Sequence, residues 1–215
     1  MSEPPNPDSD SGPETEVPLR AARPADAEAV RDIYAPFVRE SPATFRTEVP
    51  SVATVEADIR EKREHDEYPW YVAVEGETDG GKADESGGTV VGYAFGSQLR
   101  ERPAYRWAVE TSIYVDPERH RAGVGTALYD RLLGTLRRQG YCSAYAALGM
   151  PNPESEQFHE RHGFERVGRF PAAGFKLGEW HDVVWYHRRL RAGDANPAEP
   201  RPVSAVESVP PIDDG

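Results

Sequence analysis

The sequence predicts one domain that mixes helices and strands. Three observations predict it: a length of 215 residues suits a single domain with a substantial core, the apolar residues switch repeatedly between helical and strand spacing, and no internal repeat is visible. The expected order is a strand, two helices, three strands, a helix, a strand, a helix and two strands. Such an order is typical of α/β or α+β folds.

A short strand and a helix are expected first. VPLRAARPAD predicts a strand that ends at Pro24, and Asp26 is a suitable start for a helix over AEAVRDIYAPFV. One face of that helix carries Ala29, Ile33 and Phe37. Because proline lacks an amide hydrogen, Pro36 is expected to kink or end the helix.

A second helix is expected after a turn-rich loop. ESPATFRTEVP predicts the loop, and Ser51 then opens a helix over SVATVEADIREKREH. Val52, Val55 and Ile59 are expected to face the core, with the charged side chains facing solvent.

The spacing then changes to that of strands. PWYVAVEG and TVVGYAFGSQL are rich in β-branched and aromatic residues, and GETDGGKADESGG between them predicts a hairpin with an enlarged tip. RWAVETSIYVDP predicts a third strand, which stops at Asp116 and Pro117. Further along, CSAYAALG predicts a strand, PESEQFHERHGF a helix ended by Gly163, and FERVGRF and HDVVWYHRRL two final strands.

The acidic residues are concentrated in three segments. The net charge is -12, and residues 1–16, 75–88 and 192–215 carry -5, -4 and -4, which leaves about +1 for the remainder. Acidic, Pro-rich ends bury too little apolar surface to offset chain entropy, so we expect disordered tails at 1–16 and 192–215 around a domain at 17–191. That domain can attract an anion. Without a long basic face, it is not expected to bind nucleic acid.

The composition also predicts a cellular compartment. No run of about 18 apolar residues occurs, and MSEPPNPDSDSGPETE lacks the basic start and apolar stretch of a secretory signal. The single cysteine, Cys142, cannot form an internal disulfide, which agrees with a reducing environment. We expect a cytoplasmic protein with no membrane partner.

RHRAGVGTALYDRLL, residues 119–133, places two glycines before a helix. From Thr126 that helix has an apolar stripe of Leu128, Leu132, Leu133 and Leu136. A helix N-terminus attracts phosphate, and glycines let the backbone approach a ligand closely. Arg119, His120 and Arg121 add positive charge there. Taken alone, the pattern fits a tight turn as well as a phosphate cradle, and it is not a P-loop because no Gly-Lys-Ser/Thr follows.

DPERHRAGVGTALYDRLL resembles the acyl-coenzyme A signature of the GNAT N-acetyltransferase superfamily. The blocks TFRTE, YPW, ETSIYVDP, GMPN, FHERHGF and AAGFKLGEWHDVVWY are similar to the phosphinothricin and methionine sulfoximine acetyltransferases of that superfamily. The resemblance covers about residues 18–190 and implies a central mixed, mostly antiparallel sheet flanked by helices. One departure is His120, where the signature usually has Arg or Gln.

The resemblance implies that acetyl-CoA is the co-substrate and that no metal is needed. The backbone of Ile113, Tyr114 and Val115 would run beside the pantetheine arm, and an N–H there would polarise the thioester carbonyl. Asn152 matches a position that commonly bonds the same arm. The residues that would wrap the pyrophosphate are Arg121, Ala122, Gly123, Val124, Gly125 and Thr126.

Glu110 is the candidate general base. An amine is mostly protonated at neutral pH and must lose a proton before it attacks, so a carboxylate near the acceptor is useful. Glu110 heads ETSIYV and matches the base proposed for the resembled group. The alternative is an ordinary glutamate at a strand end.

His159 is the second catalytic candidate. It occupies the place where many superfamily members have a tyrosine that protonates the leaving thiolate, and histidine can do this at neutral pH. The alternative is a histidine on a helix surface near the C-terminus. His162 lies three residues away, but with no third clear ligand we expect no metal site.

The acceptor site is expected to include Phe45, Arg46 and Tyr105, which match regions that shape the amino-acid pocket in the resembled group. Arg46 could pair with a substrate carboxylate. The alternative is loop packing and a surface ion pair.

These observations predict an N-acetyltransferase that acts directly on the primary amine of a small acceptor. The acceptors implied are phosphinothricin, methionine sulfoximine or sulfone, or an L-amino acid. A protein or peptide acceptor and a non-catalytic acyl-CoA-binding module are the alternatives. The resemblance also implies a homodimer.

Overall fold

The computed structural model describes residues 17–76, 88–119 and 123–207. The expected N-terminal tail at 1–16, most of the expected hairpin tip, His120, Arg121 and Ala122 lie outside the described residues. The elements follow the predicted order, and the expected mixed sheet flanked by helices is confirmed.

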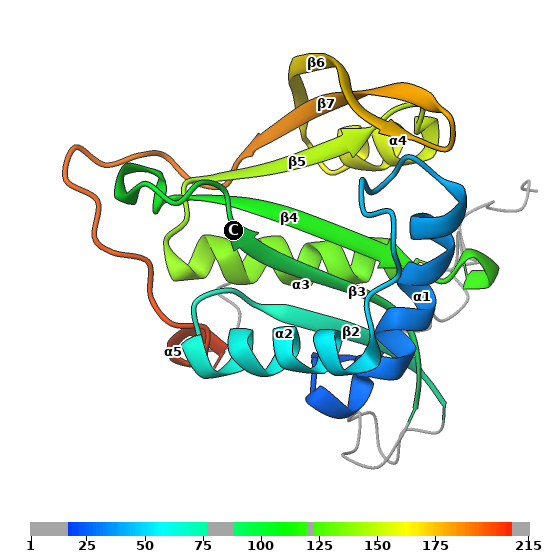
Figure 1. Ribbon diagram of the computed structural model, residues 1–215. Helices are drawn as coiled ribbons and strands as arrows, with labels where there is room; N and C mark the ends of the chain where they lie inside the picture. The colour runs from blue at the N-terminus through cyan, green and yellow to red at the C-terminus, as the bar shows by residue number, and fades with distance from the viewer. Residues whose placement is uncertain (1–16, 77–87, 120–122, 208–215) are drawn as a thin grey trace, which may run out of the picture.

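Seven strands form one sheet in the order β1-β2-β3-β4-β5-β7-β6 (Figure 1). Every neighbouring pair is antiparallel except β4 with β5, which is parallel. The strands are β1 (Leu19–Ala21), β2 (Trp70–Glu75), β3 (Thr89–Gln98), β4 (Ala108–Val115), β5 (Ser143–Gly149), β6 (Glu165–Lys176) and β7 (Glu179–Arg189).

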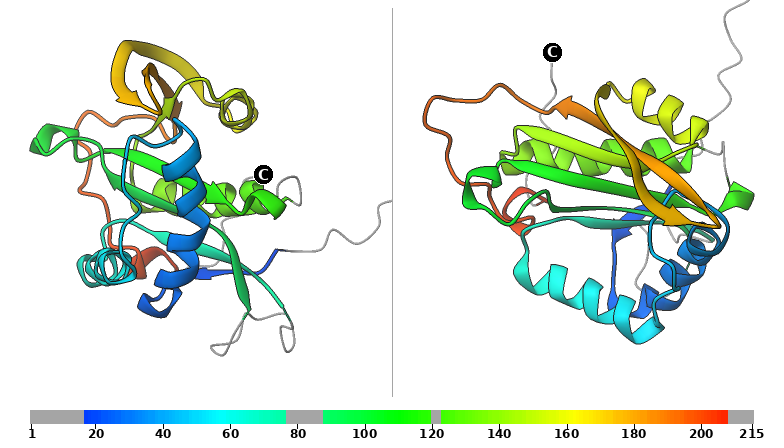
Figure 2. Two further views of the ribbon diagram at one scale, coloured as in Figure 1. Left: turned by 45° about the vertical axis from the view of Figure 1, so that its right-hand side comes forward. Right: turned by 45° about the horizontal axis from the view of Figure 1, so that its top comes forward.

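Two pairs of helices cover the two faces of the sheet (Figure 2). α1 (Ala27–Glu40) and α2 (Val52–His65) pack over β2 and β3, and α3 (Val124–Gln139) packs on the opposite face with α4 (Pro153–Arg161) beside it. The predicted leucine stripe of α3 is buried, as expected. Short helical turns are η1 (Pro24–Asp26), η3 (Pro103–Tyr105), η4 (Pro117–Arg119) and α5 (Ser204–Glu207).

α1 continues past Pro36 to Glu40, so of the two outcomes expected at this proline, a kink or an end, the helix does not end there. A proline costs the helix one backbone hydrogen bond. The last turn nevertheless buries Val38, which is 2% exposed. Its end is also held by Lys176 of β6, whose Nζ donates to the carbonyl oxygen of Phe37 at 3.1 Å.

Lys176 fixes the loop after α1 as well. Its Nζ donates to the carbonyl oxygens of Ser41 at 2.7 Å and Thr44 at 2.6 Å, and the residue is only 6% exposed. The ammonium group thus satisfies carbonyls that a helix end leaves without partners. The loop between α1 and α2 is therefore tied to the β6–β7 hairpin.

α2 begins as expected, since the Ser51 hydroxyl accepts a hydrogen bond from the Thr54 amide at 3.1 Å. Val55 and Ile59 are buried, but Val52 is 40% exposed, so its expected inward position is wrong. Val52 is the first residue of the helix, where no preceding turn covers its side chain.

Residues 192–207 differ from the expected solvated tail. We call them the C-terminal strap. Val206 is 1% exposed, the Arg201 amide donates to the Gln139 carbonyl at 2.7 Å, and the Val203 amide donates to the Asp66 carbonyl at 2.9 Å. Composition alone predicted solvation because the segment has few apolar residues. One buried valine and paired backbone groups are enough to dock it.

Among the described helices, none combines the length and the apolar character that a membrane span requires.

We expect Lys176→Met to lower the free energy of unfolding by about 3 kcal/mol, because three carbonyl oxygens lose a charged donor. Urea denaturation measures this. Lys62→Met is the matched control, since among the described residues the Lys62 ammonium donates to one carbonyl, that of Gly96, beside its contacts with the Tyr68 and Phe95 rings, and a loss of about 1 kcal/mol is expected. Equal losses in the two variants would contradict the role given to Lys176.

Candidate functional site

β4 and β5 pair over three positions and then diverge. The paired residues are Ala108 with Ser143, Val109 with Ala144 and Glu110 with Tyr145. Beyond them β4 stays on β3 as far as Val115, and β5 stays on β7 as far as Gly149. Figure 1 shows the two strands separating towards their C-terminal ends. A wedge-shaped opening results, with the β5-facing backbone edge of residues 112–114 along one side.

Side chains of this part of β4 point alternately to the two faces of the sheet. Ile113 and Val115 pack against the cluster that contains α3, whereas Tyr114 contacts Tyr34 and Phe37 of α1. The side chains of Ile113, Tyr114 and Val115 therefore pack on the two faces of the sheet. The backbone of these residues borders the opening.

The N-terminus of α3 lies at the wide end of the opening, because α3 follows β4. Gly123 caps the helix with a φ of 79°, and the amide of Ala127 donates to its carbonyl oxygen at 3.0 Å. Within the described residues, no side chain caps this end. The amides of Val124, Gly125 and Thr126 therefore form the positive end of the helix dipole. Val124 is buried and Thr126 is exposed.

Gly125 also sets the distance between α3 and α4. A Cβ at this position would lie 3.2 Å from the Phe158 ring, so glycine permits close packing. Asn152 caps α4, accepting a hydrogen bond from the Ser155 amide at 3.3 Å through Oδ1. Because α4 follows β5, Asn152 also lies at the wide end of the opening.

Glu110 lies where the opening begins. Its side chain is on the same sheet face as those of Ser112 and Tyr114, two and four residues further along β4. Burial raises the pKa of the Glu110 carboxyl, and the positive charge of Arg100 opposes that rise. A half-buried carboxylate with a raised pKa is suited to take a proton near neutral pH.

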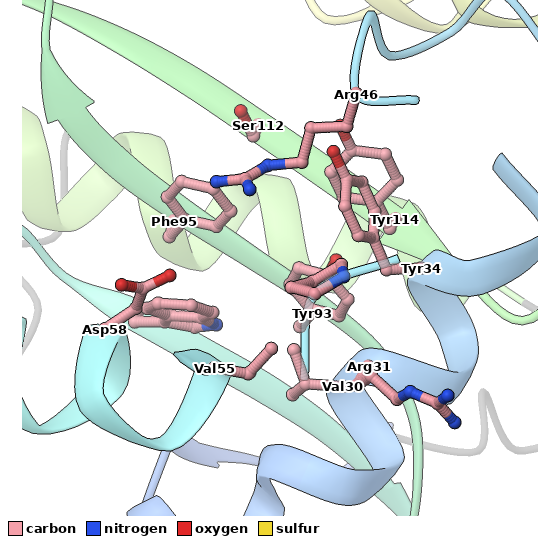
Figure 3. A pocket seen from close by; sticks show the side chains of 12 residues that line it. Val30, Arg31, Tyr34, Arg46, Val55, Asp58, Tyr93, Phe95, Ser112 and Tyr114 are labelled. Atoms are coloured by element: carbon pink, nitrogen blue, oxygen red, sulfur yellow. The ribbon is translucent and has the colours of Figure 1, made fainter. Parts of the chain in front are cut away.

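A pocket of about 180 Å³ adjoins this face of β4 (Figure 3). Five of its twelve lining residues are aromatic, and Figure 3 shows the Arg46 side chain reaching over it from the loop after α1. Among the described residues Arg46 has no acidic partner, so its guanidinium is available to an anion. The pocket residues are Val30, Arg31, Tyr34, Arg46, Pro50, Val55, Asp58, Trp70, Tyr93, Phe95, Ser112 and Tyr114.

Phe45 and Tyr105 do not line this pocket. The Phe45 ring packs on Gly174 and lies 6.5 Å from the His181 ring, so it joins the loop to the β6–β7 hairpin. Tyr105 lies in η3, between β3 and β4, and is 44% exposed. Of the three acceptor residues expected from the sequence, the structure brings only Arg46 to the pocket.

His159 is buried, not on a helix surface. It is 3% exposed and packs against Tyr129 and Phe164, with ring centroids 5.4 Å away in both cases. Nδ1 lies 2.7 Å from the carbonyl oxygen of Ser155. Burial lowers the pKa of His159 to about 4. The ring is therefore neutral at pH 7, and its one proton is on Nδ1, where the carbonyl accepts it.

Sequence reasoning missed Arg100 and Trp185. The Arg100 guanidinium lies 5.3 Å from the Trp185 ring, and Trp185 pairs with Ala147 of β5. Register puts Trp185 on the same face as Glu110. The aromatic pocket residues Tyr93 and Phe95 carried a usable signal, since they alternate along β3. Among the described residues, no cluster of three histidine, cysteine or acidic side chains could hold a metal ion.

Comparisons with known proteins agree with this geometry. The family described as "Acetyltransferase (GNAT) domain" matches residues 19–185. Phosphinothricin N-acetyltransferase of Streptomyces viridochromogenes is 37% identical over 193 residues, which cover 90% of this chain and 96% of that protein. L-methionine sulfoximine/L-methionine sulfone acetyltransferase of Salmonella typhimurium is 30% identical, covering 80% and 94% of the two chains.

A solved structure is similar over nearly its whole length. It is the phosphinothricin acetyltransferase of Sinorhizobium meliloti in complex with acetyl-CoA. The TM-score is 0.74 at 36% identity, and the match covers 86% of this chain and 95% of that one.

We expect stability to fall as pH falls from 6.5 towards 4, in part because of His159. Its folded pKa lies below the value of 6.5 for an unperturbed histidine, so the unfolded state binds the extra proton first. The loss is on the order of 3 kcal/mol across that range. Chemical denaturation at several pH values should show a smaller loss for His159→Phe than for the unchanged protein.

The control is His65→Gln, at an exposed histidine on α2. It should keep the pH dependence of the unchanged protein. If His159→Phe shows the same pH dependence of stability as the unchanged protein and His65→Gln, the inference that His159 is a neutral buried imidazole is wrong.

Proposed function

This chain belongs to the GNAT acetyltransferase family, and we propose that it transfers an acetyl group from acetyl-CoA to the primary amine of a small amino-acid-like acceptor. Phosphinothricin, methionine sulfoximine, methionine sulfone and L-amino acids are the proposed acceptors, because relatives named for the first three align over most of the chain. One observation carries the proposal: Glu110 lies at the narrow end of the opening between β4 and β5, beside a pocket lined by Arg46, whose guanidinium has no acidic partner in the part of the chain that the structure describes.

The chain has the features that acetyl-CoA requires. The backbone edge of Ile113, Tyr114 and Val115 suits the amide groups of the pantetheine arm, which can bind as an added strand. The amides of Gly123, Val124, Gly125 and Thr126 suit the pyrophosphate, together with Arg121 and Ala122. The Asn152 side chain, through its amide nitrogen, would bond the arm from the α4 side.

Glu110 supplies the base in this proposal. The carboxylate takes a proton from the acceptor ammonium, directly or through one water, and the amine nitrogen then forms a bond to the acetyl carbon as the carbon–sulfur bond breaks. The second proton that the nitrogen loses on becoming an amide passes to the departing thiolate or to water. Acetyl-CoA supplies the activated acetyl group. A backbone N–H of residues 113–115 stabilises the negative charge that develops on the carbonyl oxygen.

We do not propose His159 as the acid that protonates the leaving sulfur. The single proton of the neutral ring is on Nδ1 and is held by the Ser155 carbonyl. A thiol with a pKa of about 8.5 can leave as a thiolate without a dedicated acid. In this proposal His159 packs α4 against α3 instead, through Tyr129.

Arg46 and the aromatic walls define the acceptor class. The guanidinium of Arg46 can pair with the acceptor carboxylate, and Tyr34, Tyr93 and Tyr114 can surround the acceptor's side chain. A pocket of about 180 Å³ suits a small molecule. A peptide or protein acceptor would need an open groove, which makes it the weaker alternative. A non-catalytic acyl-CoA-binding module would have no use for Glu110.

The proposal includes a homodimer formed through the β6–β7 hairpin. β6 is an edge strand, and five large apolar side chains of this hairpin are more than half exposed. An apolar group beside a free strand edge is typical of a protein interface. The five residues are Val167, Phe170, Phe175, Leu177 and Trp180.

We expect Glu110→Gln to reduce turnover at least about 100-fold while leaving the acetyl-CoA dissociation constant unchanged, because a general base contributes roughly that much. A free-thiol release assay with amino acids, sulfoximines, polyamines and peptides measures turnover, and calorimetry measures binding. In the unchanged enzyme, the raised pKa of Glu110 means that this base becomes protonated at a pH above the usual pKa of glutamate. Activity should therefore begin to fall before the pH is lowered to that usual value.

Glu165→Gln, at an exposed position on β6, is the matched control and should leave turnover intact. Turnover with peptides or polyamines alone would exclude the small amino-acid acceptor. A Glu110→Gln rate close to that of the unchanged enzyme would exclude Glu110 as the base.

We expect Trp180→Glu to convert the dimer to a monomer, because a charge would be buried in an apolar interface. Size-exclusion chromatography with light scattering gives the mass. Val52→Glu places the same charge on an exposed apolar position of α2 and should leave the dimer intact. A monomeric unchanged protein would contradict the proposed dimer.

A further inference from the structure

The C-terminal strap connects parts of the molecule that are distant in the sequence. In Figure 1 it runs from the end of β7 past η3 and down to α5, beside α2. The proposed reaction assigns no task to these residues. We propose that the strap positions the β3–β4 loop, residues 99–107, through Trp107, and that Trp107 thereby sets the affinity for the amine acceptor. This inference rests on the proposed function.

The strap contacts the β3–β4 loop by two polar interactions. The indole Nε1 of Trp107 donates to the carbonyl oxygen of Ala198 at 2.8 Å. Arg106 forms an ion pair with Glu199, and its guanidinium lies 5.2 Å from the Trp107 ring. The partners are about 90 residues apart in the sequence. The loop is thus held by a segment that contributes nothing to the sheet.

The far end of the strap is fixed to the body of the domain. Gln139 of α3 donates through Nε2 to the Arg201 carbonyl at 2.9 Å, and Arg201 donates to the Arg138 carbonyl at 2.6 Å. Ser204 bonds to the Asp66 carboxylate, and the Tyr71 hydroxyl donates to Glu207 at 2.6 Å. The end of the strap is therefore a firm anchor.

The β3–β4 loop does not line the proposed acceptor pocket, and it acts on the site through Arg100. Arg100, near its start, lies 5.3 Å from the Trp185 ring and acts electrostatically on Glu110. Trp107, at its end, precedes β4 and accepts a hydrogen bond from the Cys142 amide at 2.8 Å through its carbonyl oxygen. The same residue therefore joins the strap, the start of the paired β4–β5 segment and the loop that carries Arg100.

Acceptor binding and acetyl-CoA binding should respond differently to a change at Trp107, whereas a general loss of stability would weaken both. The proposed acetyl-CoA contacts lie at the wide end of the opening, on α3 and α4, whereas Trp107 precedes the paired residues of β4 and β5, on the other side of Glu110. Loosening the β3–β4 loop should weaken acceptor binding and spare acetyl-CoA binding.

The test is Trp107→Phe, which keeps a ring and removes the indole N–H. We expect KM for the amine to rise about five- to tenfold, in line with the loss of one hydrogen bond. The maximal rate and the acetyl-CoA dissociation constant should change less than about twofold. Arg188→Met is the matched control: it removes one hydrogen bond to a backbone carbonyl, that of His162 at 2.7 Å, outside both the strap and the β3–β4 loop, and should lower the melting temperature without raising KM.

Hydrogen exchange gives a readout that is independent of turnover. Amides of residues 99–107 should exchange faster in Trp107→Phe than in the unchanged protein. An unchanged KM, an equal loss of acetyl-CoA affinity or unchanged exchange in the loop would overturn the inference. A KM rise of the same size in Arg188→Met would overturn it as well, because that variant leaves the strap and the loop intact. If the unchanged protein releases no thiol with any small amine, the proposed function fails, and hydrogen exchange still decides whether the strap holds the loop.

Discussion

The divergence of β4 from β5 after Glu110 is the constraint on which the rest of the site depends. Both strands are held by their other neighbours, β4 by β3 and β5 by β7, so neither can turn back to close the gap. The two helices that follow these strands must then begin at the wide end. One feature of the sheet thus places a free backbone edge, two helix N-termini and a half-buried carboxylate around a single opening.

The proposed acceptor site depends on a second set of contacts, and these hold two loops in place: the loop after α1 and the β3–β4 loop. Lys176 donates to three carbonyls around the end of α1, and Phe45 packs on glycines of β5 and β6. These contacts hold the segment that carries Arg46 above the pocket. The strap does the same for the β3–β4 loop through Trp107. The segment that carries Arg46 and the loop that carries Arg100 are therefore both positioned by residues distant in the sequence.

Much of the fold could be predicted because its signals are local. Periodicity identified every strand of the sheet, Ser51 marked the start of α2, and the glycines before α3 marked its exposed N-terminus. The errors occurred where a distant contact overrides local preference. Pro36 is tolerated because Lys176 supports the helix end, and residues 192–207 dock because Asp66 and Gln139 accept or donate hydrogen bonds to them.

By itself, the sequence determined the order of elements, the family resemblance and the position of Glu110 at the start of a strand segment. Only the tertiary structure decided which of the acceptor candidates meet: Arg46 reaches the pocket, whereas Phe45 and Tyr105 do not. It also decided the chemistry of His159, whose burial leaves the ring neutral, and it brought Arg100 towards Glu110. Burial and charge proximity arise from side chains that fold in from elsewhere in the chain, and no local pattern records them.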